Sequence, residues 1–173
     1  METIAQDAGY SRAALYRQFP NRESLDAALI QRTTQRHIVA LLERHQGAGP
    51  VDIIVETLVI VATELAHDPL LKTITGAADE GTVAQMLANS TTVTRLAEPT
   101  IEAMLREDAG QHFRRGIHPQ DLTQFLIVTA LSLLLGIIPD SENADVTRHY
   151  IEAFVLPAII TDPPQPRAVF LRA

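Results

Sequence analysis

The chain of 173 residues contains no cysteine and no tryptophan, and it has three tyrosines and five phenylalanines. Without cysteine it forms no disulfide, carries no thiol nucleophile and offers no thiolate ligand to zinc. A chain free of cysteine suits a reducing compartment, and the first residues do not combine a basic segment with an apolar run as a signal peptide does. We therefore expect a cytoplasmic protein.

Long uninterrupted apolar runs are also lacking. The two most apolar stretches, Ile53–Val61 and Phe125–Ile138, are interrupted by polar residues and fall short of the roughly 20 residues that span a bilayer. We therefore expect no membrane partner. Apolar residues still make up 46% of the chain, which is enough for a sizeable core, so these stretches are predicted core or interface helices.

Motifs for catalysis are lacking as well. The sequence has no glycine-rich phosphate loop, no G-x-S-x-G and no H-E-x-x-H. Among the six histidines, His37 and His45 are eight residues apart, about 12 Å along a helix, which is too far for one metal ion. The pair His112 and His118 flanks a glycine turn and leaves a metal-dependent enzyme open as the weakest alternative. We expect a non-enzymatic protein with no catalytic residue, no metal and no cofactor.

Acidic residues outnumber basic ones, and the net charge is −7, but the charge is unevenly distributed. Residues 1–36 hold five arginines and four acidic residues, a net charge of +1, whereas residues 37–173 carry −8. The N-terminal segment is therefore the part best suited to a polyanion. An acidic remainder disfavours attachment to nucleic acid through other faces, because the phosphate backbone repels it.

The first twenty residues have the pattern of two short helices joined by a turn. The first ends at Gly9, since glycine adopts the positive φ of a helix end most easily. Ser11 is a good N-cap for the second, in which Leu15 and Phe19 lie four residues apart and face inward. This pattern predicts a helix-turn-helix, whose second helix typically enters the major groove of DNA.

The residue pattern at positions 4–25, IAQDAGYSRAALYRQFPNRESL, resembles that of the TetR family of bacterial transcriptional repressors. The chain departs from the common pattern at Tyr10, where valine is usual, at Ala13–Ala14, where glycine-threonine is usual, and at Arg22, where lysine is usual. The resemblance implies a homodimer that binds a palindromic DNA operator and leaves it when a small ligand binds. The family also carries a helix ahead of these two. Here Met1 falls at the start of the first, so we expect the apolar core of the motif to lack one wall.

The resemblance also implies which side chains touch DNA. It places base contacts at the start of the second helix and phosphate contacts further along, on these residues: Arg12, Ala13, Ala14, Tyr16, Arg17 and Arg22. An arginine can bond guanine through two atoms, and alanine can pack on a thymine methyl group. The alternative is that the arginines form an ordinary solvated face. Tyr16 favours the DNA hypothesis, since an exposed tyrosine in mid-helix has little structural purpose.

The rest of the chain has helical periodicity throughout, so the predicted fold is all-α. Turn residues divide it into helices at about Asn21–His45, Val51–His67, a short one after Asp68–Pro69, Val83–Asp108 with a bend at Pro99, Pro119–Ile138 and Asn143–Ile160. We divide the chain into residues 1–36, a helix-turn-helix unit without its first helix, 37–161, a ligand-binding and dimerisation domain, and 162–173, an extended proline-rich tail.

The larger domain is expected to pair with a second subunit and to hold a ligand. By resemblance, the last two long helices make the dimer interface through Leu126, Ala130, Leu133, Ile137, Tyr150 and Phe154. The pocket is expected between the helices at about 51–67, 83–108 and 119–138, lined by Leu58, Ala62, Met86, Leu87, Met104, Phe113 and Phe125. These residues fit an ordinary core equally well. Because no basic residue stands among them, we expect a small apolar effector. A dimeric module that binds a small molecule or protein, without DNA, is the second hypothesis.

Overall fold

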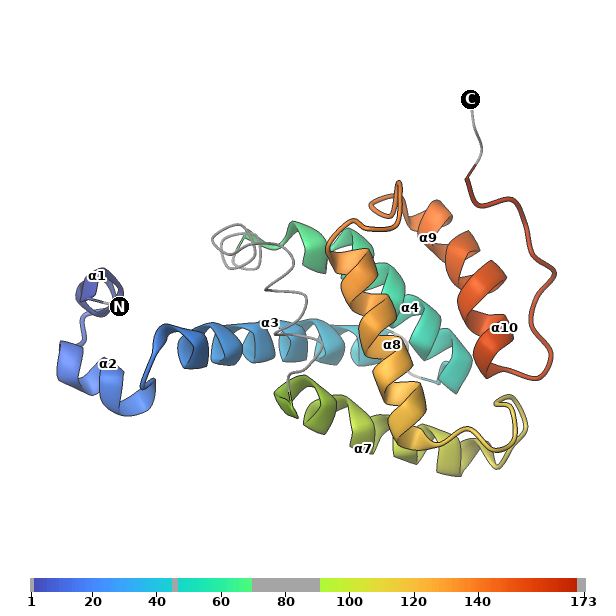
Figure 1. The fold of residues 1–173 in the computed structure, drawn as a ribbon, viewed down its shortest axis with the longest axis horizontal. Coiled ribbons are helices and arrows are strands. Elements are labelled where there is room, and N and C mark those ends of the chain that lie inside the picture. Colours follow the sequence, from blue (N-terminus) through green and yellow to red (C-terminus); the bar gives the residue numbers. More distant parts are fainter. Residues whose placement is uncertain (1, 45–46, 70–90, 171–173) are drawn as a thin grey trace.

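The computed structural model describes residues 2–44, 47–69 and 91–170, and the regular structure of these residues is helical (Figure 1). The elements are α1 (Glu2–Asp7), α2 (Arg12–Gln18), α3 (Arg22–Arg44), α4 (Pro50–Thr63), the 3-10 turn η1 (Leu65–His67), α7 (Thr91–Asp108), α8 (Pro119–Leu134), α9 (Ala144–Tyr150), the π-helical turn η2 (Ile151–Val155) and α10 (Leu156–Ile159). The predicted all-α fold is confirmed. Within the described ranges, one antiparallel bridge between Phe113 and Ile160 is the extended pairing that accompanies the helices.

The molecule has a small part, here called the head (α1 and α2), and a larger part, here called the body (α4, η1 and α7 to α10). The long helix α3 joins the two (Figure 1). α1 and α2 lie at the start of α3, away from the other helices, and the later part of α3 packs against α4 and α7. Any change in the position of α3 against the body therefore moves the head. In the described part of the chain, no helix is long and apolar enough to cross a membrane.

Side-chain caps define the helices of the head. The hydroxyl of Ser11 accepts a hydrogen bond from Ala14 N at 3.2 Å, and Gly9 ends the preceding turn with a φ of 71°. At the start of α3, Asn21 Oδ1 accepts from Ser24 N at 2.8 Å, while Ser24 Oγ accepts from Asn21 N at 3.3 Å. This reciprocal pair satisfies two of the amide groups that a helix N-terminus leaves unpaired. The predicted caps at Ser11 and Asn21 are confirmed.

The elements α9, η2 and α10 follow one another without a break and are together called the final helix. The core of the body lies between α4, α8 and this final helix. Leu58 of α4, Leu133 of α8 and Ile151 of η2 belong to one buried apolar cluster. Across the same contact, Arg148 on α9 donates to Glu56 Oε1 on α4 at 2.5 Å. The hydrogen bond and charge of Glu56 raise the pKa of Arg148 above its usual value despite partial burial, so Arg148 stays charged at physiological pH.

Two predicted helix ends were wrong. α8 ends at Leu134 rather than Ile138, because Gly136 takes a φ of 64° and turns the chain out of the helix. α4 ends at Thr63, and the 3-10 turn η1 completes the stretch to His67. The final helix starts at Ala144, in agreement with the predicted start at about Asn143, and Asn143 is its N-cap, accepting from Asp145 N at 2.9 Å. The helix predicted after Asp68–Pro69 and residues 83–90 of the next one fall outside the described residues.

The final helix widens into a π turn in its middle. Pro157 has no amide hydrogen, and its ring would collide with the carbonyl of residue 153 in a regular helix. The widened turn at Ile151–Val155 accommodates this proline and lets the helix continue to Ile159.

The chain after α10 turns back along the final helix (Figure 1). Thr161 N and Oγ1 both donate to the carbonyl of His112, at 2.9 and 3.1 Å. At the other end, Val169 is buried and the ring of Phe170 lies 6.5 Å from that of Tyr150. As expected, residues 162–170 contain no helix, but they are attached to the body at both ends.

Candidate nucleic-acid interface

One side of α2 presents cationic, aromatic and small side chains to solvent. Arg12 and Tyr16 are one turn apart, as are Ala13 and Arg17, and all four side chains are exposed. The Arg12 guanidinium lies 5.5 Å from the centre of the Tyr16 ring, a cation–π distance that holds both groups on the same surface. Ala14 is half-buried and lies at the edge of this strip.

Arg22 lies in the first turn of α3, next to the end of α2. Its side chain is 55% exposed and pairs with Asp26 Oδ2 at 3.4 Å. An exposed pair of this kind contributes about 0.3–0.5 kcal/mol, so it is easily exchanged for a contact with an anion. The structure thus places the six predicted DNA residues on α2 and the first turn of α3, and five of them are exposed.

The apolar core beneath this strip is small and open on one side. Ala5 and Leu25 are buried, whereas Leu15 and Phe19 are only half-buried. Ile4 is 37% exposed and Ala8 is exposed as well. These apolar side chains of the head are therefore partly open to solvent.

The residues predicted to line a ligand pocket have different environments. Leu58, Ala62 and Phe113 are buried in the core cluster, and Met104 packs against it half-buried. Phe125 lies on the outer side of α8 and is 38% exposed, so it does not face the space between the helices. The other two, Met86 and Leu87, fall outside the described residues.

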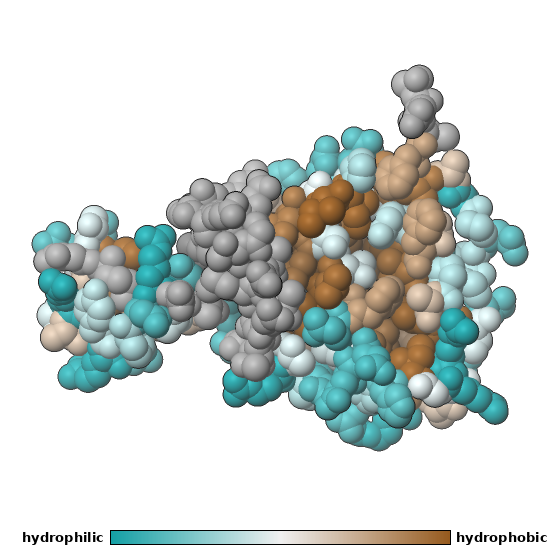
Figure 2. Space-filling view, viewed as in Figure 1, coloured by the Kyte–Doolittle hydropathy of each residue, from teal (hydrophilic) through white to brown (hydrophobic). Residues whose placement is uncertain are grey.

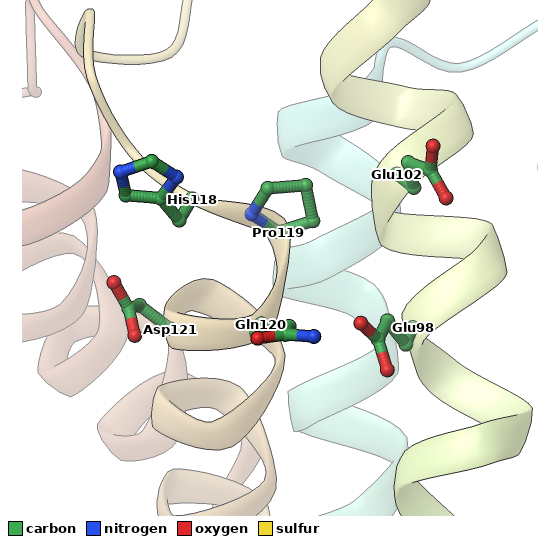
Figure 3. Close-up of a pocket in the computed structure, with 6 residues that line it drawn as sticks. All are labelled: Glu98, Glu102, His118, Pro119, Gln120 and Asp121. Carbon is green, nitrogen blue, oxygen red and sulfur yellow. The ribbon is translucent and has the colours of Figure 1, made fainter.

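A pocket of about 400 Å³ opens elsewhere, between α7 and the start of α8 (Figure 3). Its lining is polar and comprises Glu98, Glu102, His118, Pro119, Gln120 and Asp121. Figure 3 shows Glu98 projecting from α7 toward α8, with Gln120 directed toward it, and Glu102 further along α7. Sequence reasoning identified the helix start at His118–Pro119 but missed the pocket, because the two glutamates join it only through tertiary packing.

The histidines do not form a metal centre in the part of the chain that the structure describes, where no group of three or more metal-binding side chains is found. His112, one of the pair left open by the sequence, instead places its ring Nδ1 2.6 Å from Asp108 Oδ1. The buried Asp108 carboxylate also accepts from the backbone N–H groups of His112 and Phe113. His112 therefore belongs to a structural contact at the end of α7.

The residues predicted for a dimer interface separate into inner and outer positions. Leu133 is 1% exposed, and Leu126 and Ala130 pack against the same core, so these three face their own subunit. Ile137 and Phe154 are 66% and 57% exposed, and the rings of Tyr150 and Phe154 are 5.3 Å apart.

Figure 2 shows apolar side chains gathered on the face that carries α8 and the final helix. Phe125 and Val128 also belong to the exposed apolar residues of α8. The sequence signal for them was the lack of any charged residue from Leu122 to Pro139. We use the name outer face for the exposed set Phe125, Val128, Ile137 and Phe154.

Two comparisons with known proteins agree with this arrangement. Residues 1–29 match the family model described as bacterial regulatory proteins, tetR family. A solved structure described as "Molecular basis for control of antibiotic production by a bacterial hormones" superposes with a TM-score of 0.55 at 22% identity, covering 92% of this chain and 86% of that chain. At this identity the likeness concerns the fold. No curated protein matches the chain.

The described part of the chain is all-α, and its N-terminal helix-turn-helix lies within the segment that matches the tetR family model. The family match is confined to residues 1–29, which are similar to the segment described for the tetR family of bacterial regulatory proteins.

Proposed function

We propose that the protein is a cytoplasmic transcriptional repressor that binds a palindromic DNA operator as a homodimer and leaves it when a small apolar effector binds. The observation that carries this proposal is the exposed strip on α2, where Arg12, Tyr16 and Arg17 occupy one side of a helix within the segment that matches the tetR family model. A solvated face has no need of a tyrosine in this position.

Each side chain of the strip has a role that follows from its chemistry. Arg12, at the N-terminal end of α2, bonds guanine through two atoms, and Ala13 and Ala14 allow close approach of the helix or contact a thymine methyl group. Tyr16 and Arg17 bind phosphate oxygens, which sets the position of the helix in the groove. Arg22 exchanges Asp26 for a phosphate at the N-terminus of α3, where the helix dipole favours an anion.

The outer face supports pairing with a second copy. Large apolar patches of this kind are unusual on the surface of a monomer and mark interaction sites. In a two-fold dimer the same patch serves both subunits, and the two α2 helices are set to read two half-sites of a palindrome. Leu126, Ala130 and Leu133 contribute indirectly, by fixing α8 from its inner side.

Release of DNA requires that the effector binds one arrangement of the subunits better than the other, because equal affinity changes no population. α3 is the element that transmits the change, since it packs against α4 and α7 at one end and carries the head at the other. The solved structure with the same fold is described as one of hormone control, which supports control by a small molecule here.

The test is fluorescence anisotropy with labelled duplexes that tile the DNA upstream of the protein's own gene. We expect one duplex to bind at least 100-fold more tightly than the others, within the range of specific recognition. Arg12→Ala should reduce this preference by about 10-fold or more, as the loss of a two-atom guanine contact of 1–3 kcal/mol predicts. Arg115→Ala, which removes an exposed arginine of the body, is the matched control and should change nothing.

The exposed apolar outer face also supports a second candidate, a dimeric module that binds a small molecule or protein without DNA. If no duplex binds above the non-specific level while the protein is dimeric, this candidate replaces the first.

A further inference from the structure

Thr123, in the second turn of α8, has a buried hydroxyl without a hydrogen-bond partner. The residue is 1% exposed, and its Oγ1 contacts neither a donor nor an acceptor at hydrogen-bond distance. Other hydroxyls of α4 and α8 each donate to the carbonyl one turn earlier, at 2.7–2.9 Å: Thr57, Thr63, Thr129 and Ser132. Thr123 does not make the equivalent hydrogen bond to the carbonyl one turn earlier.

An unpaired buried hydroxyl destabilises a protein, so its retention calls for an explanation. In the described residues, His37 Nε2 is the other buried side-chain atom without a hydrogen bond, and it lies 3.8 Å from a carboxylate oxygen of Asp68. His37 therefore has a charged neighbour on the adjoining turn. For Thr123 Oγ1, neither a hydrogen bond nor an ion-pair neighbour is found among the described residues.

The position of Thr123 connects it to the pocket between α7 and α8. Pro119 and Gln120 line that pocket. Thr123 lies behind this lining: it follows Pro119 by four residues, on the same side of α8 and about 6 Å further along its axis. Ile127, one turn beyond Thr123, is buried. The pocket, at about 400 Å³, falls in the size range of small-molecule sites, about 300–1,000 Å³.

We propose that Thr123 is the inner hydrogen-bonding group of an effector site that is entered through this pocket. The site takes a small, uncharged and largely apolar molecule with a carbonyl oxygen, which accepts the hydrogen bond of the hydroxyl. Glu98, Glu102 and Asp121 at the entrance disfavour anions. The assignment deepens the proposed function, on which its regulatory meaning rests, and it names a residue and a ligand class for the effector.

The test uses two probes of nearly the same shape, cyclohexanone and methylenecyclohexane, which differ in a carbonyl oxygen. Each is titrated into the full chain labelled with ¹³C in the methyl groups of threonine and isoleucine. We expect cyclohexanone to shift the Thr123 and Ile127 methyl signals and to bind about fivefold more tightly, the factor that one hydrogen bond of average strength supplies. In Thr123→Val the two probes should bind equally.

Thr129→Val is the matched control, because it removes a buried hydroxyl of the same helix that already donates to Phe125 O. It should keep the fivefold preference. Equal binding of the two probes to the unmodified chain, binding of neither, or a preference that survives Thr123→Val overturns the proposal. Failure of the proposed function is separate: it is seen as absence of DNA binding without probe, and it leaves the titration unaffected.

Discussion

The carboxylate of Asp108 stabilises the turn that follows α7, and its removal has a size that the structure predicts. The carboxylate has no exposed surface, and it accepts from His112 N at 3.0 Å and from Phe113 N at 3.1 Å. The turn needs this support because Ala109 takes a φ of 49° and Phe113 then pairs with Ile160 beside the final helix.

Asp108→Ala leaves the two backbone N–H groups without an acceptor. An unsatisfied buried donor costs about 1–3 kcal/mol, so the free energy of unfolding should fall by about 3 kcal/mol. For a chain of this size that corresponds to a decrease in Tm of roughly 6–12 °C. Asp108→Asn keeps one acceptor oxygen and should lose about half as much.

The decrease in the free energy of unfolding caused by Asp108→Ala should also depend on pH. Burial raises the pKa of Asp108, but the hydrogen bonds from Phe113 and His112 lower it, and the net pKa lies below the usual value. A carboxyl whose pKa is depressed by folding contributes stability above its unfolded value, near 3.9, and loses that contribution as pH falls through the folded value. The gap between the native chain and Asp108→Ala should therefore be full at pH 7 and shrink below about pH 4.

Urea denaturation at pH 7 and pH 3.5, followed by circular dichroism, measures both effects. A difference under about 0.5 kcal/mol at pH 7 refutes the assignment of Asp108 as the acceptor of these bonds. A gap that widens toward acid refutes the sign of the pKa argument.

Three further changes have defined outcomes. Ser11→Ala removes the cap of α2 and should lower the free energy of unfolding by about 1 kcal/mol, measured by thermal denaturation; an unchanged Tm contradicts the cap. Thr123→Val removes an unpaired hydroxyl and should raise that free energy by about 1 kcal/mol, whereas Thr129→Val breaks a bond and should lower it by a similar amount; the reverse order contradicts the bonding pattern. Phe154→Lys should weaken self-association at least 10-fold in sedimentation velocity, while Val39→Lys, on exposed α3, should not; equal effects contradict the proposed interface.

The parts of the fold that local chemistry determines were predictable. Ser11, Asn21 and Asn143 each cap a helix through their own side-chain oxygen, and the residues involved lie within three positions of the cap. Gly9 takes a positive φ at the end of the first turn, where only glycine does so without strain. Such contacts depend only on residues that are neighbours in the sequence, so the sequence alone is enough to predict them.

The parts that depend on tertiary packing were less accessible. α8 is apolar nearly all round, so periodicity marks Leu133 as apolar but does not tell whether it faces its own core or a second subunit. Leu133 is buried, while Phe125, which was predicted for the pocket, is exposed. The same limit hid the pocket, since Glu98 and Gln120 come from different helices and meet only in the folded chain.

The measurement that tests the central claim most directly is the salt dependence of DNA binding. Anisotropy of the preferred duplex is recorded from 50 to 300 mM salt for the native chain, for Arg17→Ala combined with Arg22→Ala, and for Arg115→Ala. Each lost phosphate contact lowers the slope of log K against log salt by about 0.9, so the double variant should lose about 1.8 per subunit and the control nothing. A native chain with no preferred duplex, or a double variant with the native slope, would contradict the assignment of α2 and the start of α3 as the DNA-binding surface.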